Sequence, residues 1–201
     1  HRELSVYRTL YHVARLRLSK DASSAEIRKT IDEVLDVTGL ADRRDLPVSK
    51  LSGGQRKRVS IAVELLTRPS AIFLDEPTSG LDPATEFRIM QLFRQIAESG
   101  RTVVMTTHAM ENVAMFDKIA VLMLGKLVFF GPPEEALRHF GVATFRELYD
   151  KLDEPVEREA ADRPTADRSV IAGGVAENWR RKFASTPIHR QYVEEPLKQL
   201  G

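Results

Sequence analysis

The sequence contains no cysteine, which excludes disulfides, thiolate metal sites and a cysteine nucleophile. No apolar run approaches the roughly 18–20 residues that a membrane-spanning helix needs, and no signal-peptide pattern opens the chain. Neither sign of charge is in excess, and the net charge of +1 argues against a nucleic-acid partner. What is present, 42% hydrophobic and 29% charged residues over 201 positions, is typical of an ordinary globular domain with an appendage.

Helical spacing of apolar residues dominates the first third of the chain. Residues 4–17 and 24–38 each place apolar side chains on one face, and Gly39 is a plausible end for the second helix. A polar loop over 42–50 follows. We expect a third helix to begin at Ser52 and to reach about Thr67.

Strands and helices then alternate, which predicts an α/β fold with a parallel sheet. Residues 71–75 and 102–106 are short apolar runs typical of strands buried on both faces. An amphipathic helix separates them at 84–98. Two further strands, 119–124 and 127–130, are predicted to form a hairpin turning at Gly125-Lys126, before a helix at 134–140.

The composition changes near Asp153, where acids, arginines and prolines replace large apolar residues. We therefore predict a flexible charged linker over 153–174. The predicted organisation is a helical subdomain, part of an α/β core, this linker and a short helical tail, with bounds 1–70, 71–152, 153–174 and 175–201.

One glycine-rich phrase, Leu51-Ser52-Gly53-Gly54-Gln55, opens the third helix. The unpaired N–H groups and dipole at a helix N-terminus favour an anion, and glycines let the backbone approach it closely. Ser52 and Gln55 also have the spacing of a capping box, so helix initiation alone would explain both residues.

Two adjacent carboxylates, Asp75 and Glu76, end the strand 71–75. Such a pair suits Mg²⁺ binding and general-base chemistry, although acids at a strand end can also be simply solvated. His108 follows the next strand, near the edge where α/β proteins bind ligands. A lone histidine there would otherwise be interpreted as structural.

The phosphate-cradling loop G-x-x-x-x-G-K-[ST] occurs nowhere in the chain. The two phrases above therefore form only part of a nucleotide site. The chain also opens at His1 and enters a helical pattern at once, so we expect it to be a fragment of a longer protein.

Four motifs in order carry a resemblance to the nucleotide-binding domains of ABC transporters. Leu51–Gln55 resembles their signature motif, 72–76 their Walker B strand, 79–82 their D-loop, and Thr107-His108 their switch histidine. The surrounding phrases look most like the G subfamily. The resemblance covers 1 to about 150 and implies the C-terminal part of a P-loop (RecA-like) ATPase domain, without its Walker A loop and Q-loop.

The resemblance implies a role for each motif residue. Asp75 would hold Mg²⁺ through water, Glu76 would polarise the attacking water, and His108 would contact the γ-phosphate of ATP. Ser52, Gly53, Gly54 and Gln55 would touch the γ-phosphate of ATP bound to an opposite subunit. Asp82 would reach across that dimer, with a helix N-cap as its competing role.

The implied cofactors are ATP and Mg²⁺. The implied partners are a second nucleotide-binding domain and a transmembrane domain, which would place the chain at the cytoplasmic face of the cell membrane. Two alternatives stay open: a soluble ABC ATPase without a transport role, and a non-catalytic interaction fragment. We expect the isolated chain to be inactive and to expose apolar sheet surface.

Overall fold

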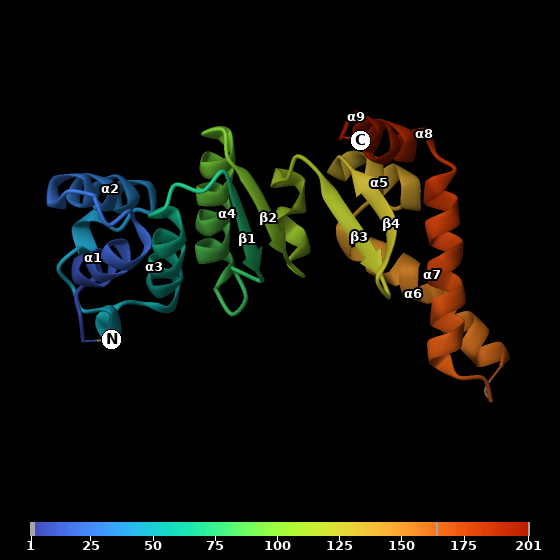
Figure 1. The fold of residues 1–201 in the computed structure, drawn as a ribbon. Coiled ribbons are helices and arrows are strands. Elements are labelled where there is room, and N and C mark those ends of the chain that lie inside the picture. Colours follow the sequence, from blue (N-terminus) through green and yellow to red (C-terminus); the bar gives the residue numbers. More distant parts are fainter. Residues whose placement is uncertain (1–2, 164, 201) are drawn as a thin grey trace. The chain divides into compact units, whose positions relative to one another are not determined.

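The computed structural model describes residues 3–163 and 165–200, and the chain divides into two compact units between His108 and Ala109 (Figure 1). This division differs from the boundaries at 70 and 152 that we predicted, because the helices and the strands before residue 108 belong to one unit. His1, at which the predicted helical subdomain begins, and Gly201, the end of the predicted tail, lie outside the described residues.

Three helices form the first part of unit 1: α1 (Val6–Arg17), α2 (Ser24–Val37) and α3 (Gly53–Leu65). A serine precedes each helix, and its hydroxyl accepts a hydrogen bond from a backbone N–H of the first turn. The helices pack on one another through the predicted apolar faces, which are fully buried at Leu10 and Ile31. Two 3₁₀ turns, η1 (Ala41–Arg43) and η2 (Val48–Lys50), replace the predicted polar loop.

A β-α-β unit completes unit 1 with β1 (Ala71–Asp75), α4 (Pro83–Glu98) and β2 (Thr102–Thr106). The strands are parallel, as predicted, and run in register from Ala71 opposite Thr102 to Asp75 opposite Thr106. Their carboxyl ends therefore lie side by side. This edge positions the candidate site.

One face of this two-stranded sheet is open, so the prediction that both strands are buried on both faces is wrong. Phe73 is 77% exposed and its register partner Val104 is 46% exposed. Ile72, which points to the opposite face, is buried. The helix α4 contacts β2 and supplies an apolar surface to only one side. The open apolar surface itself agrees with expectation.

Unit 2 begins with η3 (Met110–Met115), β3 (Ile119–Met123), β4 (Lys126–Gly131) and α5 (Pro133–Phe140). The hairpin is present, but it turns at Leu124-Gly125, one residue earlier than predicted. Both turn residues have positive φ, 47° and 73°, which is the conformation of the turn that matches strand twist. The sequence pattern located the glycine correctly and misassigned its position in the turn.

The predicted flexible linker is wrong over most of its length. Helix α6 (Phe145–Asp162) continues through Asp153, and α7 (Arg168–Ala184) follows after a short break. Leu152 and Val156 stand four residues apart and are both buried, so the charged segment carries an apolar stripe that packs against α7. The helical spacing of these apolar residues was missed because the charged composition around them favoured a linker.

The tail packs onto the hairpin rather than extending away from it. Phe183 of α7 is buried in a cluster with residues of β4, α5 and α6, namely Val128, Phe129, Ala136, Phe140, Leu148 and Leu152. Beyond α7 lie α8 (Pro187–His189), the π-helical turn η4 (Arg190–Glu194) and α9 (Glu195–Leu200). No helix among the described residues combines the length and apolarity needed to cross a bilayer.

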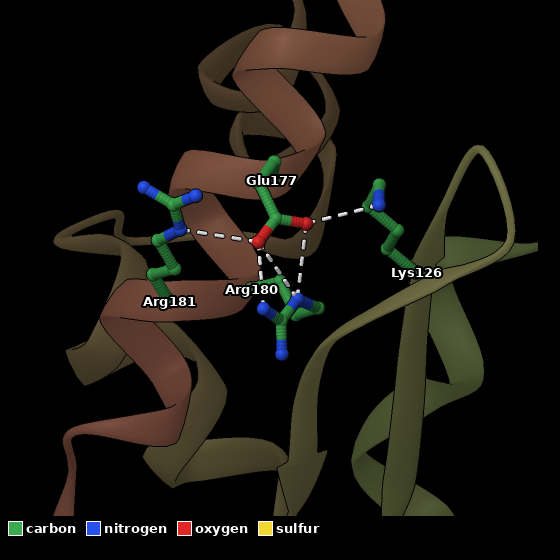
Figure 2. Close-up of polar contacts among 4 residues, drawn as sticks. All are labelled: Lys126, Glu177, Arg180 and Arg181. Carbon is green, nitrogen blue, oxygen red and sulfur yellow. Dashed lines mark hydrogen bonds and ion pairs between the residues drawn. The ribbon is translucent and has the colours of Figure 1, made fainter.

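An ion-pair cluster also attaches α7 to the hairpin. Figure 2 shows the carboxylate of Glu177 between Lys126, which extends from β4, and two arginines of its own helix. The Lys126 Nζ lies 2.9 Å from Glu177 Oε2, and Arg180 and Arg181 contact the same carboxylate at 2.6 and 3.1 Å. These hydrogen bonds, of which the one from Arg180 has the largest effect, hold the pKa of Glu177 far below its usual range.

Candidate functional site

The two adjacent carboxylates lie where β1 ends. Asp75 is the last residue of the strand, and Glu76 follows with φ of 41°, which is uncommon for a residue other than glycine. Both residues are exposed. The reversal of the chain at Glu76 continues into a turn, in which the Ser79 N–H donates to the Glu76 carbonyl at 3.1 Å.

Thr106, the last residue of β2, connects the two acidic residues. Its hydroxyl donates a hydrogen bond to Asp75 Oδ1 and accepts one from the Glu76 backbone N–H at 3.0 Å. The parallel register makes this possible because Thr106 is the direct partner of Asp75. Sequence reasoning missed this residue.

His108 completes the group at this sheet edge. Its Nδ1 lies 3.2 Å from Oε1 of Glu76, and both side chains are accessible, with exposed fractions of 67% and 49%. The structure therefore brings Asp75, Glu76 and His108 together, as the motif order led us to expect. A base next to an orienting histidine at an open strand edge can position a water molecule for attack.

The start of α3 forms the predicted capping box. Ser52 Oγ accepts from the Gln55 N–H at 3.3 Å, and Gln55 Oε1 accepts from the Ser52 N–H at 2.9 Å. The N–H groups of Gly53 and Gly54 lie in the first turn, where a helix offers them no acceptor. The capping role of Ser52 and Gln55 is therefore present, and the phosphate contacts of these four residues stay a prediction.

The two glycines differ in their surroundings. A Cβ added at Gly53 would meet nothing within 4 Å, whereas one added at Gly54 would lie 2.3 Å from Cγ2 of Thr85. Gly53 thus leaves the outer side of the helix start open for close approach. Gly54 is buried and permits α3 to pack against the first turn of α4.

Asp82 is the N-cap of α4, which was its competing role. Its Oδ1 accepts a hydrogen bond from the Thr85 N–H at 3.0 Å. Hydrogen bonding to Thr85, through the side chain and then the backbone, lowers the pKa of Asp82. Thr85, also missed in the sequence, therefore touches both the glycine of one motif and the acid of another.

The donor set at the sheet edge fits a magnesium ion that takes few of its ligands from the protein. No group of three or more His, Cys, Asp or Glu side chains arranged for a metal exists in the described part of the chain. Mg²⁺ commonly takes only one or two protein carboxylates and completes its shell with phosphates and water. The exposed carboxylate of Asp75 has the chemistry of such a ligand.

Comparisons with known proteins agree on a nucleotide-binding fold. A family model described as "AAA domain, putative AbiEii toxin, Type IV TA system" matches residues 10–112. The solved structure of cbiO1 from Clostridium perfringens, part of the ABC transporter complex cbiONQ, superimposes with a TM-score of 0.63 at 32% identity. That match covers 79% of this chain and 61% of the other.

Two curated relatives have similar identities. The chain is 39% identical over 157 residues to the ABC transporter ATP-binding/permease protein Rv1747 of Mycobacterium tuberculosis, covering 77% of this chain. It is 39% identical over 150 residues to the broad substrate specificity ATP-binding cassette transporter ABCG2 of Bos taurus, covering 71%. The matches span 18% and 23% of these relatives, so the chain corresponds to about a fifth of each.

Residues 10–112, which the family model matches, include the carboxylate edge, the α3 start and the N-cap of α4, so this comparison concerns the same part of the molecule as the site. G-family members occur among the relatives, as the phrases around the motifs indicated. The chain belongs to the AAA domain family that the matching model describes, and its curated relatives and structural neighbours are ABC transporter ATP-binding proteins.

Proposed function

We propose that this chain is the part of an ABC-type ATPase domain that carries the catalytic base, and that the complete protein uses ATP hydrolysis to drive transport across a membrane. The observation that carries the proposal is the contact between Glu76 Oε1 and His108 Nδ1 at 3.2 Å, beside Asp75 at the ends of two parallel strands. The names of the relatives support a transporter over a soluble ATPase.

Glu76 would act as the general base of this reaction. Its carboxylate would accept a proton as water attacks the γ-phosphate, and hydrogen bonding from His108 would hold the carboxylate in one orientation. Asp75 would hold Mg²⁺, which when bound spreads and offsets the charge that develops on the phosphates. Both carboxylates are accessible, as this chemistry requires.

The second group of residues would serve a different nucleotide. The first-turn N–H groups of α3, with Ser52 and Gln55, would face the γ-phosphate of ATP held by a second nucleotide-binding domain. Asp82 would contact that domain while capping α4. A transmembrane domain and a location at the cytoplasmic face of the membrane follow from this proposal.

The proposal is tested with Glu76→Gln in the full-length protein that contains this sequence. We expect loss of steady-state ATP hydrolysis, because an amide cannot accept the proton, while nucleotide binding persists and a nucleotide-trapped dimer accumulates. Glu134→Gln, at an exposed position in unit 2, is the matched control and keeps wild-type turnover. Near-normal turnover by Glu76→Gln would show that Glu76 is not the base.

A further inference from the structure

Thr106 occupies a special position at the carboxylate edge of the sheet. It ends β2 opposite Asp75, and its single hydroxyl contacts both acidic residues of β1. No motif of the sequence singles it out. Its contacts are made within unit 1 and need no partner chain.

The direction of both hydrogen bonds is fixed by the donors present. The Glu76 N–H can only donate, so it occupies an acceptor lone pair of the Thr106 oxygen. The hydroxyl proton is then available for the carboxylate of Asp75, which in its ionised form can only accept. One hydroxyl thus orients Oδ1 of Asp75 and leaves Oδ2 outside this hydrogen bond.

The same hydroxyl supports the backbone at Glu76. A φ of 41° is unfavourable for a side-chain-bearing residue and persists only where the surroundings fix it. Here the N–H is held by Thr106 and the carbonyl by the Ser79 N–H. This conformation directs the Glu76 side chain toward His108, which it meets at 3.2 Å.

We propose that Thr106 is a positioning residue of the ATPase site, whose hydroxyl orients the metal-binding carboxylate of Asp75 and fixes the backbone that carries the general base Glu76. The proposal rests on the function proposed above. It assigns to one side chain the coupling between metal binding and the base.

The first test measures the hydrogen bond itself, independently of activity. In this chain, hydrogen exchange of the Glu76 amide, measured by NMR, should accelerate at least about fivefold in Thr106→Val. The lost hydrogen bond contributes about 1 kcal/mol net, which corresponds to about a fivefold change in the equilibrium constant for opening of the amide. Thr106→Ser keeps the hydroxyl and should retain slow exchange. Thr102→Val, an exposed threonine at the other end of β2, is the matched control and should leave the Glu76 amide unchanged.

The second test uses the full-length protein. Thr106→Val should lower kcat about tenfold and raise the Mg²⁺ concentration for half-maximal rate severalfold, with Thr106→Ser and Thr102→Val close to wild type. Wild-type kcat and Mg²⁺ dependence in Thr106→Val would overturn the positioning role while the proposed function stands. Absence of hydrolysis by the unmodified protein would overturn both, even if amide exchange responds as expected.

Discussion

Replacing Gly54 by alanine should destabilise the protein, whereas the same replacement at Gly53 should not. An alanine Cβ at Gly54 would lie 2.3 Å from Cγ2 of Thr85, against about 3.5–4.0 Å for a relaxed carbon contact. The two helices must separate by more than an ångström, or Thr85 must leave its rotamer. Thr85 is β-branched and its N–H is already bound to Asp82 Oδ1, so it has few alternatives.

The magnitude follows from two opposing contributions. Overpacking of a buried contact typically costs about 1–3 kcal/mol. Replacing glycine by alanine in a helix gains up to about 1 kcal/mol, and this gain is smaller in the first turn. We therefore expect Gly54→Ala to lower the free energy of unfolding by about 0.5–2 kcal/mol. Gly53→Ala should be neutral or slightly stabilising, because nothing lies within 4 Å of its added Cβ.

Urea unfolding of this chain followed by far-UV circular dichroism measures the difference, since the only tryptophan, Trp179, lies in unit 2. Adding Thr85→Ser to Gly54→Ala should restore most of the loss, because serine keeps a hydroxyl and removes the obstructing methyl. Equal stability of Gly53→Ala and Gly54→Ala would refute the reasoning. In the full-length protein, the double variant also separates a packing role of Gly54 from close approach to phosphate, because only the packing defect is relieved.

Three further predictions concern ligand binding and pH. The isolated chain should bind ATP-Mg²⁺ about three to six orders of magnitude more weakly than a complete site. The Walker A loop, which the sequence lacks, would add at least three charge-assisted hydrogen bonds at about 1.5–3 kcal/mol each. A micromolar dissociation constant by calorimetry would contradict this. The pKa of Glu177 is lowered, so the stability it contributes is present above its ordinary pKa of 4.5 and is lost as pH falls below it. Unfolding followed by Trp179 fluorescence at a series of pH values measures this loss of stability. Glu177→Gln should reduce the loss at acid pH, whereas Glu195→Gln, at an exposed position, should not. Burial, and to a smaller extent the charge of Lys182, lowers the pKa of His139 below its ordinary value of 6.5. The imidazole is therefore protonated more readily in the unfolded chain, and unit 2 should lose stability as pH falls below about 6.5. His139→Phe should remove this loss of stability, and an unchanged profile of stability against pH would exclude His139 as its source.

The sequence was sufficient for the elements whose signals are local. Apolar positions three or four residues apart located α1 and α2, and Ser52 marked the start of α3, each within two residues. The paired carboxylates and the histidine were found because they lie at or within two residues of the ends of strands, and parallel strands bring their ends to one edge. These inferences need only chain spacing and chirality.

Errors arose where the neighbours of a segment decide its state. The charged stretch from Asp153 forms a helix because Leu152 and Val156 find an apolar partner in α7, which composition alone does not reveal. Phe73 is exposed because α4 covers one side of the sheet, although its apolar strand predicts burial on both.

By itself, the sequence determined the order of the motifs, the type of each chemical group and the family resemblance, because these depend on residue identity along the chain. Only the tertiary structure decided that Thr106 connects Asp75 with Glu76 and that Thr85 contacts Gly54. The physical reason is that such contacts join residues about 30 positions apart. A threonine has no local signal for them until strand register and helix packing bring the partners within hydrogen-bond or van der Waals distance.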